Sequence, residues 1–158
     1  MRFNNSKNIK LIPIVYFFII VSMGLFLFLS VELQHIFKGK VVFFLLTFIL
    51  LLIIIYLYKS GKYFEYDSDG ETLCLTNRGV LISEKYNYRE QKAEFPKYKL
   101  KSYKVSNYFF FKYLSVKVLS KNSNSVKKIK FNITFISNNK IKVLQKSLQK
   151  IVHQNKHR

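Results

Sequence analysis

The stretch VKKIKFNITFI (126–136), followed by SNNKIKVLQKSLQKIVHQ (137–154), contains the clearest change of periodicity in the chain. In the first part apolar and polar residues alternate, so that one face of a strand carries Ile129, Phe131, Ile133 and Phe135 and the other carries Lys128, Lys130, Asn132 and Thr134. In the second part apolar residues recur at helical spacing, at Ile141, Leu144, Leu148, Ile151 and Val152. Ser137, Asn138 or Asn139 can serve as the N-cap. The sequence therefore predicts a strand that leads into an amphipathic helix at about 138–153.

Upstream of this pair, short alternating segments separated by turn residues predict further strands. They are residues 63–67, 72–77, 80–89, 91–95, 97–105 and 108–120. Pro96 either ends the strand before it or places that strand on a sheet edge, because proline cannot donate to a ladder. A helix with one apolar face needs a surface to cover, and the open end of a curved antiparallel sheet provides one. We therefore expect residues 59–158 to form an α+β domain, in which a bent antiparallel sheet of about seven strands is capped by the C-terminal helix.

The aromatic run NYFFFKY (107–113) has two interpretations. Alternation along a strand buries much of it in the core, and this is the interpretation that the strand pattern favours. The other is an aromatic wedge that dips into a membrane interface.

Three segments carry a resemblance to a known family: LCLTNRGVLIS (73–83), AEFPKYKLKSYKV (93–105) and KKIKFNITFIS (127–137), which runs into the helix. Over residues 60–158 the chain resembles the small bacterial membrane proteins that join a transmembrane hairpin to a pleckstrin-homology-like (PH-like) module. The resemblance implies a bent seven-stranded sheet capped by a helix, and a binding role rather than catalysis. Phosphoinositide-binding members of the wider fold place basic residues around the first hairpin loop. Here that loop, DSDGE (67–71), is acidic, so no inositol-phosphate site is carried over to this chain.

Two uncharged apolar runs precede this domain. Residues 11–31 form a run of 21 and residues 41–58 a run of 18, and about 20 helical residues cross the hydrocarbon core of a bilayer. The nine residues ELQHIFKGK (32–40) connect them, which predicts a two-span transmembrane hairpin over 11–58. A cleaved signal peptide is the alternative for the first run, and two buried helices of a soluble protein are the alternative for both. The length of the runs and the lack of a small-residue cleavage site argue against these alternatives.

The basic residues that flank the two runs predict the orientation of the hairpin. The outer flanks carry five of them and the connection carries two: Arg2, Lys7, Lys10, Lys59 and Lys62 against Lys38 and Lys40. We therefore expect both termini on the cytoplasmic side of the inner (cytoplasmic) membrane, with residues 1–10 as a cytoplasmic flank. No ionisable residue lies within either run, so we interpret the hairpin as the anchor of a multi-pass membrane protein and not as an ion pathway.

Positive charge is concentrated in the last part of the chain. The net charge is +19, and residues 95–158 contain 16 basic side chains and no Asp or Glu. Two rows stand out at strand and helix spacing, namely Lys97, Lys99 and Lys101, and Lys142, Lys146 and Lys150. We expect these six lysines to contact an anionic surface, either lipid headgroups of the inner leaflet or an acidic partner. The alternative is that both rows are solvated faces.

The sequence predicts a non-enzymatic binding or adaptor protein without a cofactor. The histidines (His35, His153 and His157) and the single Cys74 have no partners at the spacing of a catalytic or metal site, and the sequence contains no glycine-rich phosphate loop. No small-molecule substrate is expected. Two other functions stay open: an accessory or immunity-type subunit that packs on another membrane protein through the hairpin, and a membrane-tethered binder of nucleic acid or another polyanion.

Overall fold

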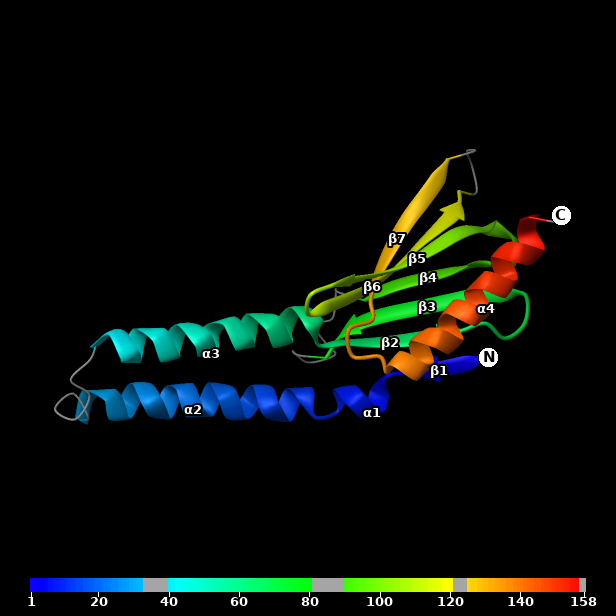
Figure 1. Cartoon of the computed structure of the whole chain (residues 1–158). Coiled ribbons are helices and arrows are strands. Elements are labelled where there is room, and N and C mark those ends of the chain that lie inside the picture. Colours follow the sequence, from blue (N-terminus) through cyan, green and yellow to red (C-terminus); the bar gives the residue numbers. More distant parts are fainter. Residues whose placement is uncertain (33–39, 81–89, 121–124, 157–158) are drawn as a thin grey trace.

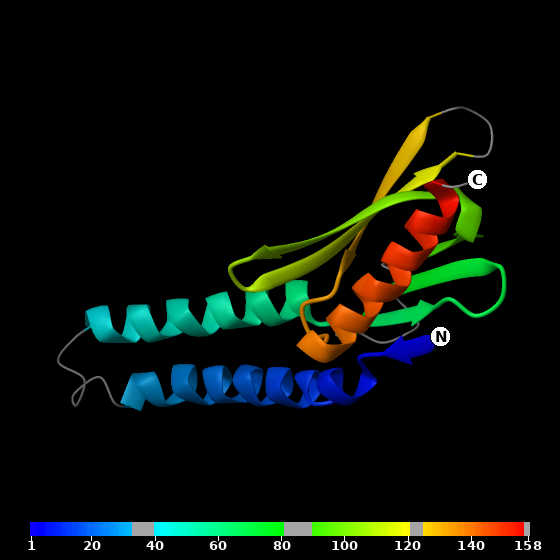
Figure 2. The same cartoon turned by 45° about the vertical axis from the view of Figure 1, so that its right-hand side comes forward.

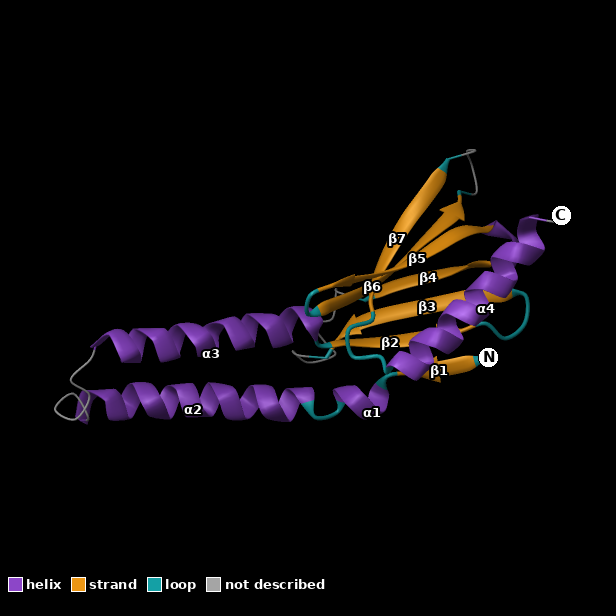
Figure 3. Ribbon diagram, in the orientation of Figure 1, coloured by secondary structure: helices purple, strands orange, loops and turns teal. Residues whose placement is uncertain are grey.

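Figures 1 and 3 show the computed structural model of the chain, which describes residues 1–32, 40–80, 90–120 and 125–156. Two long helices, α2 (Ile12–Glu32) and α3 (Lys40–Ser60), extend from one end of a domain that is built of two antiparallel sheets and a final helix. The predicted α+β class is therefore confirmed. The strand predicted at 80–89 lies outside the described residues, except for Val80, which is in a bend.

The helices α2 and α3 lie side by side in both views (Figures 1 and 2), and their bounds agree with the two predicted runs to within two residues. Among the described residues one helix, Ser6–Leu29, is long and apolar enough to cross a membrane, and a second apolar helix, Phe44–Ser60, is shorter. Only 6% of the most apolar window of the first helix is buried inside the protein, and Phe17, Phe28 and Phe44 are each more than 60% exposed. The described parts of these helices are therefore not the buried core helices of a soluble protein.

The first sheet has the strand order β1-β2-β3-β4, with antiparallel pairing throughout. Its strands are β1 (Arg2–Asn4), β2 (Lys62–Asp67), β3 (Thr72–Gly79) and β4 (Gln91–Pro96). The strand β1 was not predicted, because residues 1–10 were expected to be only a cytoplasmic flank. It covers the outer edge of β2, which would otherwise expose unpaired backbone groups, and Phe3 packs against Tyr66 with ring centroids 5.3 Å apart. A short helix, α1 (Ser6–Ile9), then leads to α2.

The second sheet has the order β5-β6-β7, with β5 (Leu100–Tyr108), β6 (Phe111–Leu119) and β7 (Val126–Asn132). The prediction of one strand over 97–105 was wrong, because Lys97–Lys99 form a short 3-10 helix, η3, and β5 begins only at Leu100. Pro96 ends β4 because it has no N–H to donate, and η3 then leads the chain from the first sheet to the second. The expected single bent sheet is thus two sheets, of four and three strands.

The strand predicted at 126–136 ends four residues early, at Asn132. The side-chain oxygen of Asn132 accepts a hydrogen bond from the backbone N–H of Thr134 (3.0 Å), and such local side-chain bonds compete with continuation of a strand. Ile133 and Ile136 are buried in the segment that follows, and α4 (Asn138–Lys156) begins where the N-cap residues predict.

The helix α4 packs across the sheets and completes the core (Figure 1). Its predicted apolar face is confirmed, since Ile141, Leu144, Leu148 and Ile151 are buried. They form one cluster with residues of both sheets, among them the fully buried Leu73, Leu114 and Phe131. Complete burial of a leucine side chain contributes about 1.5–3 kcal/mol, so this face fixes α4 on the sheets.

Two buried asparagines join the sheets to each other and to α3. The side-chain amide of Asn77 in β3 donates to the backbone carbonyls of Tyr63 (3.2 Å) and Asn132 (2.9 Å), and its oxygen accepts from the Asn132 N–H (3.2 Å). The side-chain amide of Asn132 donates to the Lys59 carbonyl in the last turn of α3 (3.1 Å). Buried polar groups are stable only when they are hydrogen-bonded, so these contacts hold both sheets and the helix in one arrangement.

Candidate functional site

The domain has two ends that expose different side chains. We call the end that carries α2 and α3 the proximal end. The opposite end, with the β2–β3 turn, η3 and the C-terminal part of α4, is the distal end (Figure 2). The strand β5 runs from the distal to the proximal end over nine residues, which at about 3.3 Å per residue is roughly 26 Å. Each predicted site residue can therefore be placed relative to the helix pair.

The predicted row Lys97, Lys99 and Lys101 lies at the distal end and does not share one strand face, because the first two belong to η3 and the third to β5. The Lys97 ammonium donates to the Gly70 carbonyl, and the Lys99 ammonium lies 5.9 Å from the centroid of the Tyr98 ring. The attraction between an anionic membrane surface and a lysine falls off within about 8–10 Å. The row lies roughly 26 Å along β5 from the proximal end, and its contact with lipid headgroups stays a prediction.

Lys142, Lys146 and Lys150 form the exposed stripe that helical spacing predicts. The helix α4 starts near α1 at the proximal end, where the Asn8 side chain donates to the Phe135 carbonyl (3.0 Å), and runs toward the distal end (Figure 1). At about 1.5 Å per residue, Lys150 lies about 12 Å farther along the helix than Lys142. The stripe therefore leads away from the helix pair, with its last two lysines toward the distal end.

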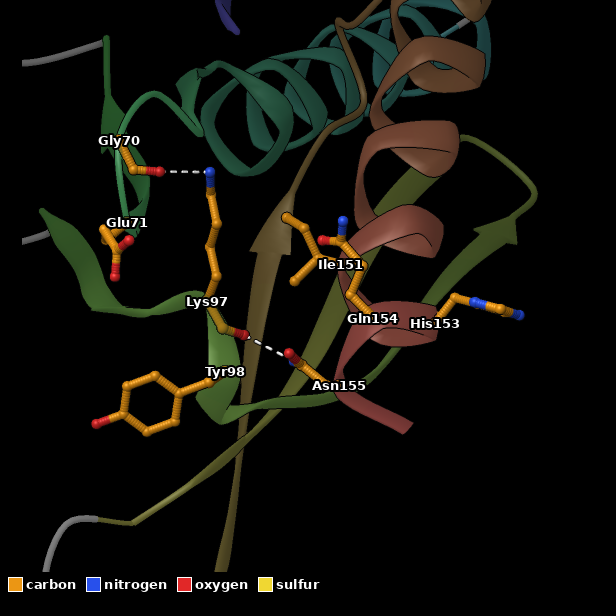
Figure 4. A pocket seen from close by; sticks show the side chains of 8 residues that line it. All are labelled: Gly70, Glu71, Lys97, Tyr98, Ile151, His153, Gln154 and Asn155. Atoms are coloured by element: carbon orange, nitrogen blue, oxygen red, sulfur yellow. Dashed lines mark hydrogen bonds between the residues drawn. The ribbon is translucent and has the colours of Figure 1, made fainter. Parts of the chain in front are cut away.

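Two adjoining hollows at the distal end together form what we call the distal pocket. One, of about 560 Å³, is lined by the β2–β3 turn, η3 and α4, through Gly70, Glu71, Lys97, Tyr98, Ile151, His153, Gln154 and Asn155 (Figure 4). The other, of about 490 Å³, is lined by Lys146, Gln149, Lys150, His153 and Gln154. The hollows share His153 and Gln154; of the predicted lysines, Lys97 lines the first, and Lys146 and Lys150 line the second. The other three, Lys99, Lys101 and Lys142, line neither hollow.

Hydrogen bonds to the backbone hold the distal pocket in shape. The Asn155 side chain donates to the carbonyls of Lys97 (2.8 Å) and Leu100 (2.9 Å), and the Lys97 N–H donates to the Glu71 carbonyl (3.0 Å). Figure 4 shows the Lys97 side chain reaching back to Gly70, whose φ of +64° is a conformation that glycine adopts without strain. Lys97 is therefore a structural cross-link between the turn and η3.

The ammonium groups that remain available at the distal pocket are those of α4. Within the described ranges, neither Lys146 nor Lys150 forms an ion pair, and both side chains are exposed. With Gln154 they offer ammonium and amide donors within about two turns of one helix. Such a donor set is suited to carboxylates or phosphates.

A second exposed feature, the aromatic tip, lies at the proximal end and consists of Tyr108, Phe109 and Phe110. Their side chains are 59%, 96% and 63% exposed, so the expectation that they pack in the core was wrong. The register of β5 and β6 pairs Tyr108 with Phe111, which leaves Phe109 and Phe110 in the turn between the strands. Phe109 has a φ of 44°, a left-handed conformation that bulky side chains rarely adopt.

The titratable groups with shifted pKa values belong to the first sheet. Burial raises the pKa of Tyr66, and burial together with the hydrogen bond to Glu65 raises the pKa of Tyr63. The hydrogen bond to Glu94 raises the pKa of Lys92. No group of three or more His, Cys, Asp or Glu in the described part of the chain is placed to hold a metal ion. These shifts have structural causes and lie outside the distal pocket.

The distal pocket was not predicted because its walls come from segments far apart in the sequence, around residues 70, 97 and 150. The only signal in the sequence was the helical spacing of the α4 lysines beside a segment without acidic residues. Comparison with family models, with curated proteins and with solved structures finds no match to this chain, so its function has to be argued from this geometry.

Proposed function

We propose that the chain is a membrane-anchored, non-enzymatic binding protein, in which α2 and α3 form a two-span anchor and the distal pocket holds an acidic partner protein. Both termini lie on the cytoplasmic side of the inner membrane, in agreement with the flanking basic residues. The distal pocket then faces the cytoplasm. The domain corresponds to the PH-like module of the small bacterial membrane proteins that the sequence resembles.

The pairing of β1 with β2 supports the two-span anchor. β1 precedes α2 and β2 follows α3, yet Arg2 pairs with Asp67 and Asn4 pairs with Glu65. Paired strands lie on the same side of a membrane, so a chain that leaves through α2 has to return before β2 begins. The apolar helix in position to do so is α3, whose 21 residues at about 1.5 Å each match the roughly 30 Å core of a bilayer. The same pairing argues against removal of the first run as a signal peptide, because β1 lies before that run.

The observation that carries the binding role is the pair Lys146 and Lys150 beside the distal pocket. Like charges one helical turn apart cost roughly 0.2–0.5 kcal/mol in isolation, and an anionic partner removes that cost. No Asp or Glu in residues 95–158 neutralises them. The distance of the distal end from the helix pair favours a partner in the cytoplasm over the headgroups of the same bilayer.

The test uses the full chain in nanodiscs of zwitterionic lipid, titrated with a fluorescent oligo-glutamate peptide as the acidic probe. The double substitution Lys146→Gln/Lys150→Gln removes two exposed contacts worth about 0.5–1 kcal/mol each, so Kd rises roughly five- to thirtyfold. Lys127→Gln/Lys128→Gln is the matched control, because it removes the same charge from exposed lysines of β7 and leaves Kd within about twofold. Binding by the unaltered chain weakens as salt increases.

Other results would favour other functions. Equal weakening by both double substitutions would show that net charge, and not the distal pocket, binds the probe. A DNA or RNA oligonucleotide that binds more tightly than the peptide would favour the nucleic-acid alternative. A stoichiometric membrane partner that is retained by the helices regardless of either substitution would favour an accessory or immunity-type subunit.

A further inference from the structure

Among the described residues of the two-sheet domain, the aromatic tip is a contiguous group of exposed large side chains. Tyr108, Phe109 and Phe110 follow one another in the β5–β6 turn, and the rings of Phe109 and Phe110 are in edge-to-face contact with centroids 4.5 Å apart. Exposed apolar residues that occur singly need no explanation, but a contiguous group marks a contact site. The left-handed backbone of Phe109 presents its side chain to the outside at a conformational cost.

The aromatic tip contacts the last turns of α3. Tyr56 donates from its hydroxyl to the Phe110 carbonyl (3.4 Å), and its ring centroid lies 6.0 Å from that of Phe110 and 5.4 Å from that of Phe111. Figures 1 and 2 both show the β5–β6 turn beside this part of α3. Tyr56 belongs to the uncharged run 41–58, so the aromatic tip lies at the level of the apolar part of the helix and not beyond it.

The composition around the aromatic tip is that of a membrane interface. Tyrosine is enriched at the headgroup level of spanning helices, where Tyr56 lies, four residues or about 6 Å before the end of α3. The Lys130 ammonium lies 3.9 Å from the ring centroid of Tyr113 and 5.7 Å from that of Tyr108, so positive charge lies next to the Tyr108 ring of the aromatic tip. Apolar rings in front of a basic side chain match the order of acyl chains and anionic headgroups in a leaflet.

We infer that the aromatic tip inserts into the lipid interface of the bilayer that holds α2 and α3, and so forms a third attachment of the domain to the membrane. The inference rests on the proposed two-span anchor, because the level of Tyr56 in the bilayer sets the level of the tip. Phe109 is the deepest residue of the domain, and the lipids around it are the partner. The domain is thereby held in one orientation, with the distal pocket turned away from the membrane.

The experiment uses tryptophan as a depth reporter, since the chain contains none. Three single-Trp variants of the full chain are reconstituted in vesicles that carry lipids brominated either near the headgroup or deep in the acyl chain. Phe109→Trp reports the aromatic tip, Phe48→Trp reports the middle of α3, and Tyr98→Trp reports the distal end; the three native side chains are 96%, 60% and 55% exposed, so each site accepts the indole. Phe110→Trp serves as a second tip reporter if Phe109→Trp does not fold.

The expected result has a different quenching profile for each position. Phe48→Trp is quenched most by deep bromines. Phe109→Trp is quenched most by shallow bromines and emits at shorter wavelength than Tyr98→Trp. Tyr98→Trp is quenched only by aqueous acrylamide. If Phe48→Trp is quenched while both tip reporters behave like Tyr98→Trp, the anchor stands and the insertion of the aromatic tip is overturned. If Phe48→Trp is not quenched by either lipid, the proposed anchor fails and the insertion fails with it.

Discussion

Replacing Asn77 with Ala removes the side chain that joins the two sheets. The substitution breaks three hydrogen bonds, to the Tyr63 carbonyl and to both backbone groups of Asn132. Asn77 is only 1% exposed, so water does not take its place. A buried polar group that loses its partner costs about 1–3 kcal/mol, and three such groups at the low end of this range cost about 3 kcal/mol. At about 4 °C or more per kcal/mol for a domain of this size, we expect Tm to fall by about 12 °C.

The isosteric substitution Asn77→Asp tests the direction of these bonds. It keeps one acceptor oxygen but places the other where the amide lay, 2.9 and 3.2 Å from two carbonyl oxygens. The carboxyl can donate to them only when it is protonated, so its pKa in the folded state rises above the usual value of about 3.9. Because the folded state then binds this proton more tightly than the unfolded state does, the stability of the variant falls as pH rises above about 4.

Thermal unfolding of the full chain in detergent micelles, followed by circular dichroism, measures both variants. Asn107 is an exposed asparagine of β5, and Asn107→Ala and Asn107→Asp are the matched controls, expected to lie within about 0.5 kcal/mol of the unaltered protein. Two results would refute the reasoning: an Asn77→Ala protein that melts no lower than Asn107→Ala, or an Asn77→Asp deficit that does not grow with pH.

Two further predictions concern the core. Leu144→Asp places an unpaired charge among fully buried side chains and should unfold the domain. Val143→Asp, at a site 45% exposed on the same helix, should fold. Circular dichroism of the full chain compares the two variants, and equal melting would contradict the packing of α4. Burial raises the pKa of Tyr66 in the folded state. The contribution of the Tyr66 hydroxyl to the free energy of unfolding is therefore complete below about pH 10 and is lost as pH rises above that value. Tyr66→Phe should therefore lose less stability than the unaltered protein in alkaline urea titrations, although it starts lower because it lacks the hydrogen bond to Ser147.

The features that were predicted correctly are those in which a local pattern and burial agree. The sequence pattern of α4 predicted where the helix begins and which of its faces is buried, because a helix presents residues three and four positions apart to the same surface. The alternation along residues 72–77 predicted the strand that forms the first part of β3, in which Leu73 and Leu75 are fully buried.

The features that were missed depend on partners distant in the sequence. β1 is three residues long, too short for a periodic pattern, and it forms because β2 leaves an edge to cover. The alternation of lysines after Pro96 is typical of a strand, but the chain changes sheets at that point and η3 replaces the first residues of the strand. The aromatic run 108–110 looked like core because hydrophobicity alone does not show where a hairpin turns; the register of β5 and β6 decides that.

The ladder between β1 and β2 makes the helix pair and the sheets one mechanical body. Lys10 and Leu11 are the only residues between α1 and α2, and Gly61 is the only residue between α3 and β2, so neither connection contains a flexible linker. Residues on the same face of a strand are roughly 6.6 Å apart, and a slip in register has to cover that distance. A displacement of one helix along its axis by about 1.5 Å is far smaller, so the strands do not slip in register. In the proposed two-span anchor, a change of bilayer thickness or tension that tilts α2 and α3 is therefore transmitted to the distal end as a lever rotates, with its arm of roughly 26 Å along β5.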